Sequence, residues 1–306
     1  MSTILPLNPV TKLKKDVIQS SETLGDAEVR QLVDIYYKYQ EDRIRNNAQV
    51  REAEKVKEPS RVIHYLAEQS HVLEKEIQKV LTYYVKSKDE GRWLIHNVGI
   101  AGVLASGLLA HIDINKAPTV GHIWNYAGLN PSPDREWKKG QKRPHNAQLK
   151  TLCYKIGESF VKVSNHKDSF YGAEYKKRKQ FEIDRNEQGY YKDHASNQLK
   201  KKNYGKTTDA YKCYSQGKLP PAHIHAIAKR WVVKLFLSHF HAIWYENEFG
   251  QKAPVPYAIA HLGHAHLIEP PFTTIYLYLN HYLPLFTTIL HPTTTKKTFH
   301  KNTHKQ

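Results

Sequence analysis

The amino-acid sequence predicts a mostly α-helical protein. Apolar residues recur at helical spacing in three long segments, 26–58, 60–88 and 222–250, whereas no run of residues alternates as a β-strand would. Prolines and capping residues stand at the ends of these segments, where helices begin and end. With 306 residues and a hydrophobic fraction of 40%, the chain can build a core, although one leaner than average.

The charge of the chain is strongly positive. Lys and Arg number 46 against 29 Asp and Glu, which gives a net charge of +17. Such a surface favours polyanions, and nucleic acid is the default partner. An anionic membrane is the alternative, but no stretch reaches the roughly 20 apolar residues that a spanning helix needs. No signal peptide opens the sequence, and Cys153 and Cys213 are its only cysteines, so we expect a cytoplasmic, nucleoid-associated protein without disulfides.

Residues 1–25 are expected to form a flexible leader. The first long helix is then predicted over residues 26–58, with Asp26 as the residue that caps its start. Pro59 ends this helix, and Ser60 can cap the next one.

The second long helix, residues 60–88, carries an apolar seam with heptad-like steps of four, seven, four, three and four residues. Residues 26–90 are therefore predicted to be a helical arm, either a hairpin or a coiled coil that pairs two copies of the chain. Packing of the second helix on its own domain is a further alternative. The sequence predicts a homodimer through 60–88. The seam consists of Val62, Leu66, Leu73, Ile77, Val80 and Tyr84.

The most apolar stretch, "NVGIAGVLASGLLAHIDI", opens a predicted helical domain over residues 91–250. Its run Gly99-Ile100-Ala101-Gly102 has the pattern of a helix-hairpin-helix, although alanine stands where the motif has a second turn glycine. Glycine permits a tight turn, and the turn leads into a helix N-terminus whose N–H groups and dipole can bind a phosphate. Such a contact recognises the DNA backbone and no base sequence. The alternative is a buried helical turn in which small residues serve only packing.

The motifs around this stretch resemble a known family. "GIAGVLASGLLAHIDI", then "YAGLNP", a basic glycine-containing loop and "N-x-x-L-K-x-L-x-Y" are similar to the C-terminal half of the insertion-sequence one-ten class of bacterial transposases. The resemblance runs from about Ile95 to Glu158 and continues more weakly, so that it covers about half of the chain.

The resemblance implies a nuclease, but the catalytic residues of that nuclease are not found at the matching positions of this sequence. Members of the class join a RuvC-like domain with four metal-binding acidic residues, a coiled coil and a C-terminal domain with a catalytic serine in a Ser-Lys-x-Gly-Asn stretch. Here Asn146 matches the asparagine, but Lys142 stands at the position of the serine. Ser132 and Ser159 lie outside the motif, and residues 1–95 predict helices in place of a nuclease fold. The acidic residues of that part follow a solvated helical face: Asp16, Asp26, Asp34, Glu41 and Asp42.

The remaining basic residues predict a nucleic-acid surface. From Arg135 to Gln216 the chain holds 20 Lys and Arg against 9 Asp and Glu, and residues 165–220 form a basic insertion in which tyrosines are interleaved. Such a mixture of cations and tyrosines suits a surface that contacts phosphates and stacks on bases. The alternative is that this stretch is a solvated, partly disordered loop. The tyrosines are Tyr171, Tyr175, Tyr190, Tyr191, Tyr204, Tyr211 and Tyr214. Beside Gly99, Ile100, Ala101 and Gly102, the predicted DNA-binding residues are Lys138, Lys139, Lys142, Arg143, Asn146, Lys150, Lys176, Lys177, Arg178 and Lys179.

The 19 histidines do not predict a metal site. Two pairs, His223 with His225 and His239 with His241, are spaced i, i+2, which on a helix directs them to different faces. The "HLGHAH" stretch at 261–266 lacks a clear set of further ligands. No cofactor is predicted, and residues 251–306 are expected to be an irregular tail.

These observations predict a transposase-like DNA-binding protein that acts in DNA transposition and recombination. Its partners would be DNA, with structured RNA as a second candidate, and a second copy of the chain. No membrane is expected among its partners. The alternative is a catalytically inactive architectural or accessory nucleic-acid-binding protein derived from a transposase. A helical structural protein with a basic surface is a third possibility.

Overall fold

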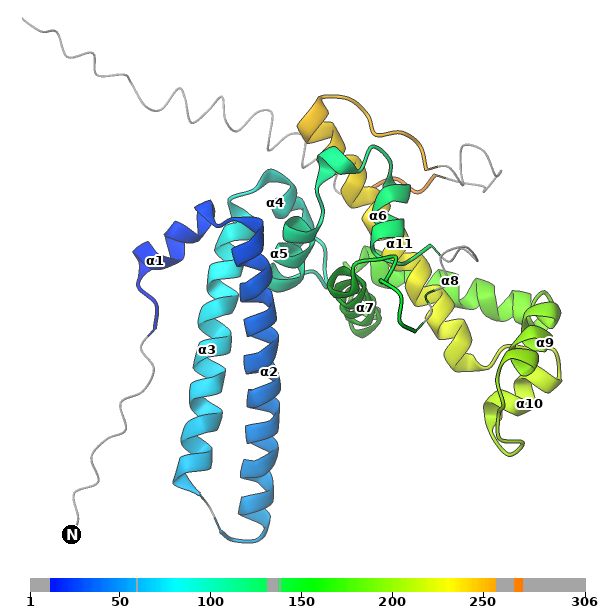
Figure 1. Ribbon diagram of the computed structural model, residues 1–306, viewed down its shortest axis with the longest axis horizontal. Helices are drawn as coiled ribbons and strands as arrows, with labels where there is room; N and C mark the ends of the chain where they lie inside the picture. Colours follow the sequence, from blue (N-terminus) through cyan, green and yellow to red (C-terminus); the bar gives the residue numbers. More distant parts are fainter. Residues whose placement is uncertain (1–11, 59, 131–136, 138, 257–266, 272–306) are drawn as a thin grey trace, which may run out of the picture. The chain divides into compact units, whose positions relative to one another are not determined.

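The computed structural model describes residues 12–58, 60–130, 137, 139–256 and 267–271. The described residues contain helices and no β-strand, which confirms the predicted mostly α fold (Figure 1). By internal contacts the chain divides into two units, Met1–Glu269 and Pro270–Gln306, and every helix of the described residues belongs to the first. None of the described helices combines the length and apolar character that a membrane span requires.

The segment before the first long helix is ordered in its described part. The backbone N–H of Leu13 donates to the Glu76 carboxylate (3.1 Å), and the Ser21 hydroxyl lies 3.2 Å from the Val80 carbonyl oxygen. Residues 12–25 therefore pack on a helix far along the chain, and the prediction of a flexible leader over 1–25 is wrong for them, while residues 1–11 lie outside the described part. The segment forms α1 (Lys15–Gln19) and the 3-10 helix η1 (Ser20–Thr23).

Two long helices follow and pack side by side as a hairpin (Figure 1). Gly25, and not Asp26, is the N-cap of the first helix, because the Glu28 carboxylate accepts the Gly25 N–H (2.9 Å). The Ser60 side chain accepts the Ile63 N–H (3.3 Å), which confirms Ser60 as the cap of the second helix. The helices are α2 (Asp26–Lys55) and α3 (Arg61–Lys86).

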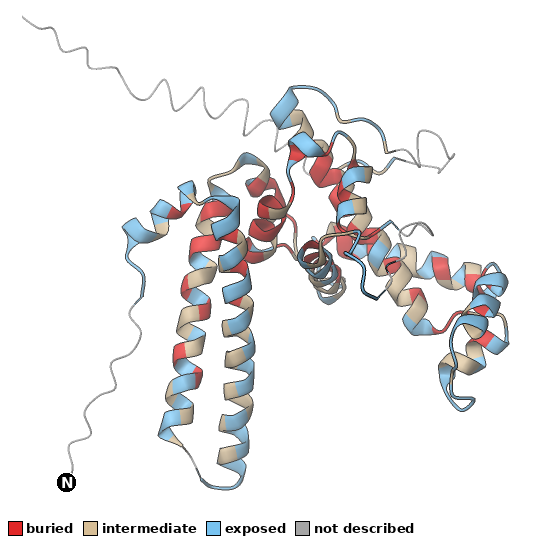
Figure 2. Ribbon diagram, in the orientation of Figure 1, coloured by how far each residue is buried: buried red, intermediate tan, exposed pale blue. Residues whose placement is uncertain are grey.

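The apolar seam of α3 is only partly used inside this hairpin. Val80 and Tyr84 are buried, but Val62 and Leu66 are 63% and 48% exposed. Farther along the hairpin the two helices meet through polar groups, since Arg43 and Gln40 of α2 both reach the Glu74 carboxylate. The buried residues of α2 lie in its half nearer to α4 and α5, whereas those of α3 continue along the helix as far as Ala67 (Figure 2). The hairpin alternative is therefore the one observed, and the homodimer stays a prediction.

A short, almost fully buried helix, α5, contacts α2, α3, α4 and α7. Its small residues allow this close approach. A Cβ added at Gly102 would lie 2.8 Å from the Thr82 Cα of α3, and one at Gly107 would lie 2.7 Å from the Leu152 side chain of α7. The Ser106 hydroxyl lies 3.0 Å from the Leu81 carbonyl oxygen of α3. The helix bounds are α4 (Asp89–His96), α5 (Gly102–His111), η2 (Ile114–Lys116), α6 (Val120–Tyr126) and α7 (Ala147–Lys162).

The last long helix, α11 (Pro221–Phe249), closes the core. It contacts α4, α6, α7 and α8, and its Phe236 stacks on Trp93 of α4. It ends at Gly250, whose φ of +65° confirms the predicted glycine stop. The other large buried aromatic residues of this core are Phe160, Tyr171 and Phe240.

Residues 165–220 form a helical lobe and not a partly disordered loop. The lobe consists of three helices packed with the start of α11. Tyrosines fill positions that Leu, Ile or Val would usually occupy, which explains how a stretch poor in aliphatic residues folds. Its small core contains Tyr191, Ala195, Tyr214, Leu219 and Ile224. Its helices are α8 (Phe170–Glu187), α9 (Lys192–Lys201) and α10 (Asp209–Ser215).

Candidate nucleic-acid interface

The turn between α4 and α5 has the geometry of a helical hairpin. Gly99 adopts a φ of +102°, which a residue with a side chain rarely adopts, and the Ile100 N–H donates to the Asn97 carbonyl (2.9 Å). Ala101, the N-cap of α5, is exposed and offers no side chain to cap the helix. The N–H groups at the start of α5 therefore lack a side-chain cap at the positive end of the helix dipole.

The same turn is held against the end of α7. The Ser159 hydroxyl donates to the Gly99 carbonyl oxygen (2.5 Å). A Cβ at Gly99 would lie 3.1 Å from Val163 and 3.3 Å from Phe160. Glycine at this position thus satisfies both the backbone conformation and the close packing. Gly102 lies against α3, so its absence of a side chain serves the contact with Thr82 and not the turn.

Three adjoining cavities follow α7 and form what we call the α7 groove. The turn cavity, about 350 Å³, lies at the start of α5; the middle cavity, about 220 Å³, lies between α2 and α7; and the loop cavity, about 320 Å³, lies beside the loop before α7. Tyr37 and Lys155 line both the turn and middle cavities, and Ala147 and Thr151 line both the middle and loop cavities. The α7 residues of the groove include Ala147, Lys150, Thr151, Lys155, Ser159 and Lys162.

The cations of the groove are not held in close ion pairs, although the Glu41 carboxylate attracts the Lys155 amine. Within the described part of the chain, Arg143, Lys150, Lys155 and Lys162 form no ion pair. The Lys155 amine instead lies 3.4 Å from the centre of the Tyr37 ring, and burial lowers its pKa. Cations without an acidic partner are available to a bound anion.

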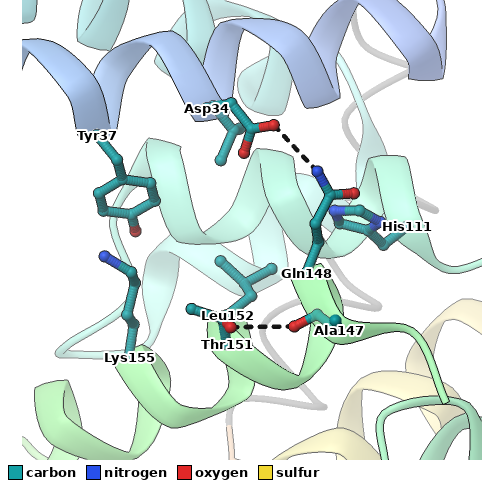
Figure 3. Close-up of a pocket in the computed structure, with 9 residues that line it drawn as sticks. Asp34, Tyr37, His111, Ala147, Gln148, Thr151, Leu152 and Lys155 are labelled. Carbon is teal, nitrogen blue, oxygen red and sulfur yellow. Dashed lines mark hydrogen bonds between the residues drawn. The ribbon is translucent and has the colours of Figure 1, made fainter. Parts of the chain in front are cut away.

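Two acidic residues also line the groove, and both have partners. Glu158 is ion-paired with Lys229 of α11, which together with its other contacts keeps the pKa of this carboxyl low. Asp34 of α2 accepts a hydrogen bond from the Gln148 amide of α7 (3.0 Å), which bridges the middle cavity (Figure 3). Glu158 is thereby paired with a cation, whereas the partner of Asp34 is a neutral amide.

The basic loop before α7 is built on an aromatic residue and a glycine. The Trp137 indole donates to the Gln141 carbonyl (2.7 Å), the Arg143 guanidinium lies 5.5 Å from the Trp137 ring centre, and Gly140 adopts a φ of +89°. Lys139 and Lys142 are exposed on this loop, and Lys138 lies outside the described residues.

Asn146 joins this loop to the helical domain. Its side chain accepts the Leu149 N–H (2.9 Å), which confirms the predicted cap of α7. Its amide donates to the Tyr126 hydroxyl (2.9 Å), and its backbone N–H donates to the Tyr126 carbonyl (2.9 Å). These bonds fix the end of the loop to α6 beside the groove.

The predicted cations of α8 lie elsewhere and line none of the three cavities. Arg178 is ion-paired with the fully buried Glu182 (2.5 Å), and Lys177 is paired with Glu174 (2.7 Å). Lys176 donates to the Asn165 side chain (2.9 Å), while Lys179 lies near His225 and helps to lower the pKa of that histidine. Arg178 thus contributes to the fold of the lobe.

The prediction that the tyrosines of residues 165–220 stack on bases is wrong for four of them. Tyr171, Tyr175, Tyr191 and Tyr214 are buried. Three of these hydroxyls are hydrogen-bonded to histidines of α11: Tyr171 to His239 (2.8 Å), Tyr175 to His225 (2.7 Å) and Tyr214 to His223 (3.1 Å). Tyr190 is exposed, with the Arg185 guanidinium 3.4 Å from its ring centre.

Three of the four histidines of α11, His223, His225 and His239, therefore pair with tyrosines. His239 also lies 2.7 Å from the Ile268 carbonyl oxygen, and burial lowers its pKa to about 4. His241 lies 2.7 Å from the Ala117 carbonyl oxygen. The described residues contain no group of three or more potential metal ligands, and the stretch 261–266 lies outside them.

The structure places several unpredicted residues in the groove. Tyr37 and Asp34 come from α2, which the sequence indicates only as part of an arm, and Gln148, Lys155 and Lys162 come from α7. A signal for the α7 residues was present, because Lys155, Ser159 and Lys162 recur at steps of four and three and so share one helix face. No comparable signal marks the α2 residues, since their approach to α7 is a tertiary contact.

Comparison of the chain with protein-family models, curated proteins and solved structures found no match of any of the three kinds.

Proposed function

We propose that the protein binds DNA through the phosphate backbone along the α7 groove, as a transposase-like protein of DNA transposition and recombination. The observation that supports this most is the start of α5, which lacks a side-chain cap and adjoins a cavity lined by Lys155 and Lys162. Helix N–H groups with a helix dipole bind one phosphate, and the neighbouring lysines can bind others.

The dimensions of the groove suit this ligand. From Lys150 to Lys162, α7 rises by about 18 Å, which corresponds to about five base pairs of duplex axis. The basic loop with Lys139, Lys142 and Arg143 continues the same cationic surface at the start of α7. Contacts of this kind position the DNA without recognising its sequence. Binding should therefore be similar for different duplex sequences.

Removal of the two lysines tests the proposal. Lys155→Gln with Lys162→Gln should lower duplex affinity and flatten the dependence of log affinity on log salt concentration by about 1.8 units, at about 0.9 per phosphate contact. The matched control is Lys177→Gln with Lys212→Gln, which removes the same charge from exposed lysines that are paired with acidic residues on α8 and α10. An equal loss of duplex affinity in both double variants would mean that only the net charge of the protein matters, and would contradict a DNA-binding site in the α7 groove.

An accessory, catalytically inactive binder is the second candidate, and one observation favours it. Ser159, the described serine nearest to the motif, donates its hydroxyl to the Gly99 carbonyl, and Lys142 occupies the motif position that the resemblance gives to serine. A strand-transfer assay with duplex DNA and Mg²⁺ separates the candidates. Joined products favour the transposase, whereas binding without products favours the accessory role. Competition with a structured RNA tests the second candidate partner.

A further inference from the structure

The middle cavity of the α7 groove contains chemistry that backbone binding does not use. Its walls include the Tyr37 ring and the aliphatic side chains of Val33 and Leu152. Figure 3 shows the bridged pair Asp34 and Gln148 at one end and Tyr37 with Lys155 at the other. A carboxylate such as Asp34 repels phosphate, so its presence in a cationic groove needs another explanation.

The polar end of this cavity presents hydrogen-bond acceptors beside the His111 ring (Figure 3). The Gln148 amide nitrogen donates to Oδ2 of Asp34 (3.0 Å). This bond leaves Oδ1 of Asp34 and the amide oxygen of Gln148 as acceptors. A ligand that fits must therefore offer N–H donors at its edge and a flat face to the Tyr37 ring, from which the Lys155 amine turns away towards the phosphate. Unpaired nucleobases have this form, because enzymes that extrude a base hold it by stacking and by hydrogen bonds to its pairing edge.

We infer that the middle cavity receives an unpaired guanine of the bound DNA. Guanine is the natural DNA base with two adjacent N–H donors on its pairing edge. They match the two oxygens of the Asp34 carboxylate, because Oδ2 keeps a second lone pair beside its bond from Gln148. The cavity, at about 220 Å³, is several times the ~30 Å³ that one water molecule occupies in the liquid.

The neighbouring turn cavity supplies the place for the phosphate. Tyr37 and Lys155 line both cavities, so a nucleotide whose phosphate lies at the start of α5 has its base beside the Tyr37 ring. Lys155 then stands between the phosphate and the base. This inference rests on the proposed DNA binding and adds the kind of nucleotide that the groove binds preferentially.

Binding of duplexes with one unpaired base tests the inference. Four duplexes of otherwise identical sequence carry a central unpaired guanine, a central unpaired inosine, a central unpaired adenine or no unpaired base. The affinity of each for the full chain is measured by fluorescence anisotropy. The guanine duplex should bind about tenfold more tightly than the uninterrupted duplex. Inosine, which lacks the exocyclic amine, and adenine should gain less.

Two variants and one control locate the effect. Asp34→Asn should abolish the preference for guanine over inosine, and Tyr37→Leu should reduce the gain for every unpaired base. Asp42→Asn is the matched control, because it removes the same charge from α2 at a residue that lines none of the three cavities and should keep the preference. Asp34 is exposed, so its replacement should not affect folding, which circular dichroism checks.

The possible failures are distinguishable. Equal affinity for all four duplexes would overturn the base site and leave the proposed DNA binding intact. A guanine preference that survives both Asp34→Asn and Tyr37→Leu would also overturn it, since the base would then bind elsewhere. Absence of binding to any duplex would refute the proposed function and the base site together.

Discussion

The α7 groove and the lobe of α8, α9 and α10 are both rich in Lys and Arg, but several cations of the lobe are ion-paired whereas the described ones of the groove are not. In the groove, Lys155 and Lys162 line a cavity without forming an ion pair among the described residues. In the lobe, Arg178 and Lys177 are paired with acidic residues of the same helix. The difference shows that the density of positive charge along a sequence does not reveal which charges are available to a ligand. Availability depends on whether the fold supplies an acidic partner.

The largest expected effect concerns the basic loop that continues the groove. Replacement of Lys138, Lys139, Lys142 and Arg143 by Gln should lower duplex affinity and flatten the log–log salt slope by about two to four units, because each lost phosphate contact removes about 0.9. Filter binding across a salt series measures the slope. The midpoint of thermal unfolding should change little, since the three described cations of this set are exposed. An unchanged slope would remove this loop from the DNA surface.

The lobe should show the opposite behaviour. Arg178→Met removes the close ion pair of the fully buried Glu182 and leaves it the Tyr191 hydroxyl and the longer contact to Arg185 (3.6 Å), so the free energy of unfolding should fall by about 3 kcal/mol. Urea unfolding measures this loss. Duplex affinity of the folded variant should stay within about twofold of the original, as expected for a cation outside the DNA surface. Loss of DNA affinity without loss of stability would reverse the assignment of Arg178.

The histidines of α11 predict a stability that falls in acid. Burial lowers the pKa of His239 to about 4, below its unfolded value of about 6.5. The folded state therefore binds fewer protons, and its stability declines as the pH falls from about 6.5 towards 4. Linkage gives a loss of about 2 kcal/mol from His239 between pH 7 and pH 5. Urea unfolding at both pH values should show this loss, and His239→Asn should reduce the difference. An equal difference in the variant would assign the acid sensitivity to other groups.

The smallest expected effect separates stability from binding at one residue. Ala101→Asp supplies the missing cap of α5, so it should stabilise the protein by about 1 kcal/mol. The same carboxylate occupies the proposed phosphate site and should lower duplex affinity. Ala101→Asn is the matched control, with a similar cap and no charge, and should weaken binding less. Stabilisation by Asp with unchanged affinity would show that DNA does not contact the start of α5.

Local signals in the sequence were sufficient to predict much of the fold. The cap residues Ser60 and Asn146 and the helix stop at Gly250 act on their own neighbours, and the structure confirms each. The turn glycine Gly99 was identified because its backbone conformation is a local requirement. Asp26 was misassigned by one position, because Gly25 with the Glu28 side chain serves as the cap.

Features that depend on distant parts of the chain were not predictable in the same way. The tyrosines of the lobe suggested an exposed stacking surface, but Tyr171 and Tyr175 meet histidines more than 45 residues away on α11. Gly102 was assigned to the turn, whereas its packing against Thr82 belongs to the contact between α5 and α3. Asp34 followed the pattern of a solvated helix face and is exposed, yet it also reaches Gln148 across the groove.

The contact of Gly102 with the backbone at Thr82 has a mechanical consequence. Glycine allows α5 to approach both the side chain and the backbone of Thr82 on α3, which leaves no room for a second side chain between the helices. The Ser159 hydrogen bond holds the other side of the turn. We therefore expect the start of α5 to move together with α3 as one rigid body. A force applied along the long hairpin of α2 and α3 would then tilt the N–H groups of α5 and change their affinity for an anion.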